Sequence, residues 1–349
     1  METKLAIGTT TEEMRALYFN ATQLKEPNYK LWQLNSKGKR YYYTYVDNEP
    51  VFYPSVTTIL HNVMPENKYL TEWKLNLGKE QSLAYTMERA SYGSFIHGQL
   101  AELMIGRTYN LDDVRERLTR YVEKEQLAVG FIDAHEEEAK ADIMAFAKWM
   151  QDYGVRPYAV EVALYSPSMG LAGMIDLGCS LRTYSKSDER KDIEKAGGDE
   201  KKLAKIAEKA EVRINAIVDF KSGKKGFYDE YAIQLELYRR MWNENFPDTP
   251  IERIFNIAPK DWLGTVKKVP SYTFEEQTEN PILAKVDLLV ALYKLSEEEQ
   301  KKVVVMNGVI NLDKEDESNV QVFTLSELVK ARKTPENTQI EDKSIDELC

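Results

Sequence analysis

An acidic residue and a lysine stand two positions apart at the end of an apolar run in the middle of the chain. Residues 214–218 read Ile-Asn-Ala-Ile-Val, and Asp219, Phe220 and Lys221 follow them directly. Successive side chains of a strand point to opposite faces, so Asp219 and Lys221 share one face while Phe220 points to the core. Because burying either charge without a partner is costly, we expect a polar or charged group between them.

A second carboxylate ends another apolar stretch upstream, where residues 173–176 read Gly-Met-Ile-Asp. Asp176 and Asp219 would bridge a Mg²⁺ or Mn²⁺ ion, with the backbone carbonyl of Phe220 as a further hard oxygen ligand. Lys221 would orient or activate the attacking water and stabilise the charge that develops in the transition state. These residues predict metal-dependent cleavage of a phosphodiester, and an Asp–Lys ion pair on a solvated edge strand is the alternative.

Two more polar residues stand where they could contribute to such a site. His97 follows Gly93 on an expected helix at 90–103, and it would either complete the coordination of the ion or be an ordinary buried histidine. Glu161 interrupts the apolar run Val-Glu-Val-Ala-Leu at 160–164, where a carboxylate is expensive to bury without a partner. It would therefore either contact the metal or point outward from a half-exposed strand.

Gln234 and Tyr238 stand four residues apart and share one face of an expected helix at 230–242. Both could hydrogen-bond a phosphate or the lysine of the site, although an ordinary amphipathic helix has the same spacing. Lys224 and Lys225 lie close to the site in sequence and are candidates for phosphate contacts.

The order of these residues, Gly-x3-His, Glu, Gly-x2-Asp, Asp-x-Lys and Gln-x3-Tyr, resembles the PD-(D/E)XK nuclease superfamily in the branch that includes RecB-type nuclease domains. The resemblance covers roughly residues 54–258 and implies a restriction-endonuclease-like core. It implies the metal ligands His97, Asp176 and Asp219, the catalytic Lys221, the supporting Glu161, and a trailing motif of Gln234 and Tyr238.

A narrower resemblance lies upstream, in Pro-Ser-Val-Thr-Thr-Ile-Leu at 54–60 followed by Trp73 and Gly78 ahead of the Gly-x3-His motif. These features are similar to phage exonucleases and the mitochondrial genome maintenance exonuclease group. The resemblance implies action on single-stranded DNA from an end, in recombination, repair or phage replication. It also implies that Ser55 and Thr57 contact the strand at the mouth of the cleft.

Composition restricts the alternatives. The chain has 349 residues and a net charge of −10, which argues against a non-specific nucleic-acid binder but does not exclude a nuclease whose metal supplies positive charge. Two cysteines, Cys179 and Cys349, exclude a disulfide framework and an iron–sulfur cluster, and with it the iron–sulfur exonucleases of the superfamily. No apolar run approaches the roughly 20 residues of a membrane span, and the start does not resemble a targeting signal. We expect a reducing cytoplasm, bacterial or phage-infected, and no membrane partner.

The helices and strands that the sequence predicts around these residues indicate an α/β fold. It would have a small mixed sheet flanked by helices and a helical N-terminal half. Residues 1–53 would form an arm, helical over the first 30 residues, and a hairpin region. Residues 54–310 would form the nuclease domain with a charged insertion at 183–211, and residues 311–349 an acidic, partly disordered tail. Beyond the helices above we expect helices at 112–127, 133–153, 274–295 and 326–332, and strands at 159–165, 170–181, 213–221 and 251–258.

Taken together, the sequence predicts a DNA exonuclease that uses Mg²⁺ or Mn²⁺ and acts on single strands or free ends, with a recombination or replication protein as a second partner. The alternatives are a non-catalytic DNA-binding scaffold of the same fold and a structure-specific endonuclease. Lys39 and Arg40 precede tyrosines at 41–43, a pattern that suits a single-stranded path. We favour a plain hairpin strand with tyrosines on both faces.

Overall fold

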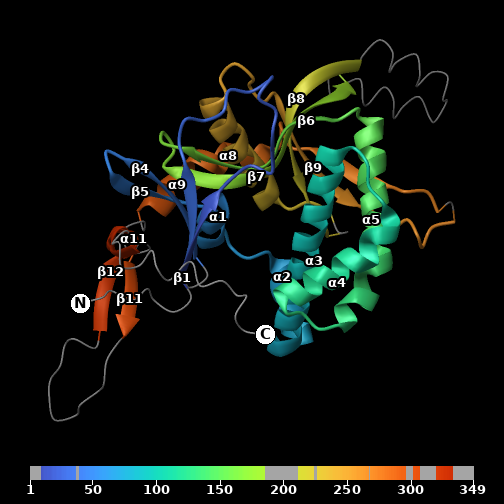
Figure 1. Ribbon diagram of the computed structural model, residues 1–349, viewed down its shortest axis with the longest axis horizontal. Coiled ribbons are helices and arrows are strands. Elements are labelled where there is room, and N and C mark those ends of the chain that lie inside the picture. The colour runs from blue at the N-terminus through green and yellow to red at the C-terminus, as the bar shows by residue number, and fades with distance from the viewer. Residues whose placement is uncertain are drawn as a thin grey trace.

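A mixed six-stranded sheet forms the centre of the molecule. The computed structural model describes residues 9–36, 39–184, 211–223, 226–266, 268–295, 302–306 and 320–332. The central strands are β2 (Tyr18–Phe19), β6 (Arg156–Ser166), β7 (Leu171–Tyr184), β8 (Glu211–Phe220), β9 (Arg253–Pro259) and β10 (Tyr272–Glu276). Their order is β10-β9-β8-β7-β6-β2 (Figure 1). Strands β8 and β9 run parallel, and the other neighbours are antiparallel.

Helices cover both faces of this sheet, which makes the core a three-layer α/β structure. One face packs against α3 (Lys79–Gly106), α4 (Val114–Glu125) and α5 (Gly130–Asp152), and the other against α1 (Val56–Val63), α8 (Asp229–Asn245) and α9 (Val286–Lys294) (Figure 1). Helix α2 (Lys68–Leu77) packs on α3, and two short 3₁₀ helices lie at Leu111–Asp113 and Pro281–Lys285. Burial of both faces explains why the middle of β8 is apolar at three consecutive residues, Ala216, Ile217 and Val218. The chain is therefore of the mixed α/β class.

A second sheet, antiparallel throughout, packs on the edge of the core. It has the order β1 (Thr9–Met14), β3 (Leu31–Ser36), β4 (Lys39–Val46) and β5 (Glu49–Pro54). The tyrosines at 41–43 are buried in it, alternating between its two faces. The interpretation of this stretch as a hairpin strand with tyrosines on both faces is thus confirmed.

The C-terminal part of the described chain also joins this region. Strands β11 (Lys302–Met306) and β12 (Val320–Thr324) pair with each other, and α11 (Leu325–Arg332) follows. Leu325 and Val329 are buried against β3, β4 and β5, which confirms the helix expected at 326–332. The rest of the expected tail and nearly all of the insertion at 183–211 lie outside the described residues.

Two expected elements are wrong. The start of the chain forms strands β1 and β2 rather than a helix, because the threonines at 9–11 favour an extended backbone and β1 pairs along its length with β3. The long helix expected at 274–295 is instead β10, a 3₁₀ turn and α9. Pro281 opens that turn and Asn280 caps it through a bond to the amide of Ile282, so the helix begins only afterwards.

The remaining helices lie close to the expected positions. Helix α3 begins earlier than expected, at Lys79. The N-terminal half is helical only from α1 onward, because strands β1 to β5 precede that helix. Ser55 caps α1 through a bond from the amide of Thr58 to its hydroxyl, at 3.0 Å. Among the described residues, no helix is both long and apolar enough to cross a membrane.

Candidate metal centre

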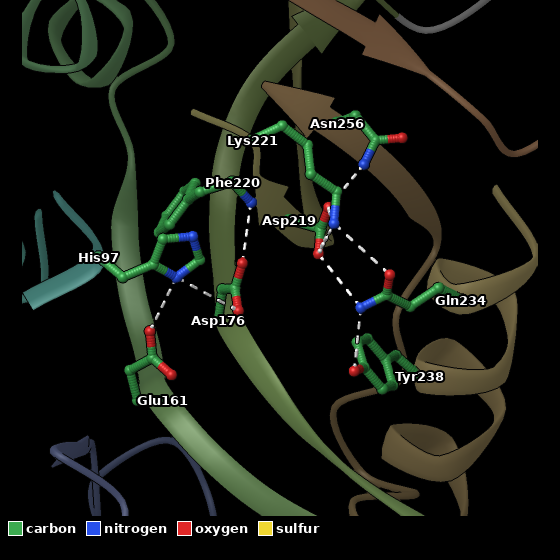
Figure 2. A network of polar contacts seen from close by, with 9 residues as sticks. All are labelled: His97, Glu161, Asp176, Asp219, Phe220, Lys221, Gln234, Tyr238 and Asn256. Atoms are coloured by element: carbon green, nitrogen blue, oxygen red, sulfur yellow. Dashed lines mark hydrogen bonds and ion pairs between the residues drawn. The ribbon is translucent and has the colours of Figure 1, made fainter. Parts of the chain in front are cut away.

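Three potential metal ligands converge where α3 meets the sheet. His97 comes from α3, Glu161 from β6 and Asp176 from β7, and one ligand atom of each lies within 4.8 Å of the others (Figure 2). The His97 Nδ1 atom is 3.4 Å from Glu161 Oε1 and 3.9 Å from Asp176 Oδ1. Two carboxylates and an imidazole are a donor set that fits a divalent cation such as Mg²⁺ or Mn²⁺.

The backbone departs from regular strand geometry at this point. Glu161 has a φ of 50°, a left-handed conformation that costs on the order of 1–3 kcal/mol in a residue other than glycine. Val160 packs in the cluster beside α3 and α5, whereas Val162 packs in the cluster beside α1 and α8. Residues two apart on a strand normally share one face. The apolar neighbours of Asp176 are divided in the same way, so both strands change face at the carboxylates.

Lys221 and Asp219 form a second group beside the three ligands. The Lys221 ammonium is 2.9 Å from Asp219 Oδ2, which confirms that the two side chains share one face. Asn256 on β9 donates to the same oxygen at 2.8 Å, and the Gln234 amide lies 3.5 Å from Oδ1 (Figure 2). Tyr231 places its ring 4.2 Å from the ammonium. Each group therefore limits the movement of the next.

Phe220 links the two groups. Its ring is buried beside Phe146 and Trp149, as expected for a core-facing residue. Its backbone N–H donates to Asp176 Oδ2 at 2.9 Å. Because the N–H and C=O of a strand residue point to the same side, the Phe220 carbonyl faces Asp176 as well. The role of this carbonyl as a metal ligand stays a prediction, as does bridging by Asp219, whose oxygens are engaged by Lys221.

Helix α8 supplies the trailing pair. Gln234 donates to the hydroxyl of Tyr238 at 3.1 Å, and its side-chain oxygen lies 3.5 Å from Lys221 Nζ. Gly173 on β7 makes room for this arrangement, because a Cβ there would lie 2.6 Å from the Tyr238 ring. Gly93 is similarly close to the segment after the lysine, since its Cβ would lie 3.2 Å from Ser222 Oγ.

Burial and charge together favour proton uptake at the centre. Burial raises the pKa of Asp219 to about 6, although the ammonium of Lys221 opposes the shift. Burial likewise raises the pKa of Asp176, against the effect of His97. Burial lowers the pKa of His97, but the carboxylates of Asp176 and Glu161 outweigh it and raise the value to about 9. In the metal-free protein an imidazolium thus supplies the positive charge between two carboxylates, and an ion must displace its proton.

Lys221 is held as a cation. Burial lowers the pKa of its amine, but Asp219 and Asp176 outweigh burial and raise the pKa above the ordinary value. The ammonium therefore persists at neutral pH, where it can stabilise an anion rather than accept a proton.

The centre forms the floor of an open cleft of about 1640 Å³. Ser55, Thr57, Arg15 and Arg40 also line this cleft. Lys224 and Lys225 lie outside the described residues.

A scan against protein-family models and a search of curated proteins both find no match for the chain.

One wall of the cleft consists of aromatic side chains. Tyr69 and Trp73 come from α2 and Tyr85 from α3, and we call these three residues the aromatic wall. Tyr69 is 77% exposed and Tyr85 52% exposed, while the rings of Trp73 and Tyr85 meet edge to face with centroids 5.4 Å apart. Helix α2 contains no buried residue, so its apolar side chains contribute to a surface rather than to a core.

The sequence missed two parts of this arrangement. Asn256 holds Asp219 from the neighbouring parallel strand, and the signal for it was a single polar residue inside the apolar run at 254–257. Tyr69 and Tyr85 carry no motif, and only their shared position beside the cleft relates them to the site.

Proposed function

We propose that the chain is a metal-dependent DNA exonuclease with a restriction-endonuclease-like core, similar to the PD-(D/E)XK nucleases. The observation that supports this most strongly is the chain segment Asp219-Phe220-Lys221. Its lysine contacts Asp219, and its central amide holds Asp176. These three consecutive residues, together with Asp176 on β7, thereby bring two carboxylates and the ammonium of Lys221 to one cleft.

The residues have distinct tasks in this proposal. Asp176, Glu161 and His97 hold Mg²⁺ or Mn²⁺, and the ion supplies an activated water and stabilises charge on the phosphate. Asp176 is kept in place by the amide of Phe220. Lys221, oriented by Asp219 and by the ring of Tyr231, stabilises the negative charge that develops on the phosphate oxygens.

The cleft walls support DNA as the substrate and single strands as the preferred form. The aromatic wall offers ring faces for unpaired bases, and each stacked base is worth roughly 1–3 kcal/mol. Arg15 and Arg40, which are exposed and line the same cleft, offer positive charge to the phosphates. A recombination or replication protein is a partner that this substrate suggests.

A cleavage time course tests the proposal. Single-stranded, duplex and circular DNA, labelled at either end, are incubated with the protein in Mg²⁺ or Mn²⁺. We expect progressive loss of linear single strands, no loss of circles, and no cleavage by Asp219→Ala. Asp248→Ala, which removes an exposed acid outside the cleft lining, serves as the matched control and should cleave normally.

Other outcomes distinguish the alternatives. Cutting of closed circles that depends on Asp219 would indicate an endonuclease with the same centre. Retained DNA binding with no cleavage of any substrate would contradict the exonuclease and favour a non-catalytic scaffold.

A further inference from the structure

An exposed tyrosine lies in the cleft on the same helix that carries Gln234. Tyr228 is the N-cap residue of α8, but its side chain makes no capping hydrogen bond. It is 40% exposed and lines the same cleft as Lys221. An exposed aromatic ring that does not cap its helix can offer its surface to a ligand.

Helix α8 lines the cleft with one of its faces. Tyr228, Tyr231, Gln234 and Tyr238 all belong to the cleft lining, and each stands three or four residues after the one before. Gln234 and Tyr238 are engaged with each other, because the amide of Gln234 donates to the hydroxyl of Tyr238 (Figure 2). Tyr228 ends this face at the N-terminus of the helix, and it is the most exposed of the three tyrosines.

Two ring contacts connect Tyr228 to Lys221. The ammonium of Lys221 lies 4.2 Å from the centroid of the Tyr231 ring, and the centroids of Tyr231 and Tyr228 are 5.6 Å apart. The Tyr228 ring is therefore no more than about 10 Å from the ammonium. In a nucleotide a single sugar joins the base to its phosphate. A base whose phosphate contacts Lys221 can thus reach the ring of Tyr228.

This ring is separate from the aromatic wall. The wall comes from α2 and α3, and α3 covers one face of the central sheet, whereas α8 covers the other. Lys221 follows the last residue of β8, a strand of the sheet between these two layers. A single strand that crosses the metal centre can therefore meet rings from both layers of helices.

We propose that Tyr228 forms a base-binding subsite of the metal centre. Its ring stacks on the base of the nucleotide whose phosphate contacts Lys221. Stacking on an aromatic ring accepts every base, because each base has a π face. This inference rests on the proposed function, since it takes DNA as the ligand of the cleft.

Binding of mononucleotides by the full chain in Mn²⁺ tests the proposal, because these probes contain no phosphodiester to cleave. The probes are thymidine 5′-monophosphate, thymidine 3′-monophosphate and the base-free 2-deoxyribose 5-phosphate, each titrated by calorimetry. Tyr228→Ala removes the ring, and Tyr228→Phe keeps the ring without its hydroxyl. Leu288→Ala is the control, at a residue of α9 that is 70% exposed and does not line the cleft. Thermal unfolding monitors the fold, and Tyr228→Leu replaces Tyr228→Ala if that variant is unstable.

We expect the wild type to bind at least one nucleotide about tenfold more tightly than the sugar phosphate, which is within the effect of one stacked base. Tyr228→Ala should bind that nucleotide and the sugar phosphate about equally, because the ring is missing. Tyr228→Phe and Leu288→Ala should keep the wild-type ratio. The isomer that loses more affinity in Tyr228→Ala identifies the side of the phosphate on which the ring lies.

A wild type that binds the nucleotides no more tightly than the sugar phosphate would overturn the proposal. So would a wild type that binds none of the probes, or a Tyr228→Ala variant that keeps the wild-type ratio. Cleavage of DNA is measured separately. Absent cleavage with the expected binding ratios would contradict the exonuclease but support the subsite, whereas normal cleavage with equal binding would contradict the subsite alone.

Discussion

The floor and the aromatic wall of the cleft are built in opposite ways. On the floor, Asp219 is 3% exposed and is contacted by Lys221 and Asn256. The backbone N–H of Phe220 donates to the carboxylate of Asp176 beside it. On the wall, α2 buries none of its side chains, and Tyr69 is 77% exposed. The charged groups of the floor are thus held by residues from several strands, whereas the rings of the aromatic wall are open to solvent.

This difference separates two tasks. A floor whose charges are held before substrate arrives suits chemistry, because preorganised groups need no rearrangement in the transition state. A wall of exposed rings suits recognition of bases irrespective of sequence. We therefore expect floor variants to lose rate on every substrate and wall variants to lose affinity for single strands.

The largest effect is expected at Asp176. Asp176→Asn removes a charged ligand but keeps the shape of the side chain and the bond from the Phe220 amide. Loss of the ion's contribution of several kcal/mol corresponds to a cleavage rate lower by about 10³-fold. Calorimetric titration with Mn²⁺ should show no binding, and normal Mn²⁺ binding by the variant would contradict the assignment.

A pH dependence of metal affinity is expected next. The raised pKa of His97, about 9, means that a proton leaves the imidazole when an ion binds at lower pH. Mn²⁺ affinity should rise by close to tenfold per pH unit up to about pH 9. In His97→Gln the rise should be much smaller, while His61→Gln, at an exposed histidine, should behave as the wild type. A wild-type affinity that is independent of pH would exclude His97 as a ligand.

The same shift predicts how the metal-free fold responds to pH. The pKa of His97 is about 9 in the folded protein against an ordinary value of 6.5, so its charge stabilises the fold fully below pH 6.5. That contribution is lost as the pH rises towards 9. Thermal unfolding in EDTA should show a Tm that falls across this window, and the fall should be smaller in His97→Gln. When Mn²⁺ replaces EDTA, the bound ion should reduce the fall. A decline of the same size in the variant would indicate another titrating group.

The smallest effect is expected on the wall. Trp73→Ala should weaken single-strand binding by the stacking of about one base, roughly 1–3 kcal/mol, and leave duplex binding unchanged. Leu75→Ala is the matched control, because Leu75 is on the same helix, is 77% exposed and does not line the cleft. Anisotropy titrations in EDTA measure both. Equal losses on single strands and duplexes would show that the wall does not discriminate between them.

What the sequence could predict follows from local periodicity. The alternation of Asp219, Phe220 and Lys221 depends only on strand geometry, and the structure places all three as expected. The hairpin strand with tyrosines 41–43 on both of its faces was an equally local feature. These predictions required only the order of polar and apolar residues along one strand, and no knowledge of its neighbours.

What the sequence could not predict depends on partners far along the chain. Strand β1 exists because β3 pairs with it, and Asn256 reaches Asp219 because β9 lies parallel to β8. The left-handed backbone of Glu161 has no signature in residue type, since it depends on both flanking strands changing face. These features required the assembled sheet.

The central claim is that Lys221 acts on a phosphate at a metal-bearing floor, and a single-turnover cleavage rate tests it most directly. DNA is bound first, saturating Mn²⁺ starts the reaction, and Lys221→Ala is compared with the wild type and with Lys25→Ala, an exposed lysine outside the cleft lining. The account predicts a rate about 10²–10³-fold lower for Lys221→Ala alone, with Mn²⁺ and DNA binding retained. A rate equal to the wild type would contradict it.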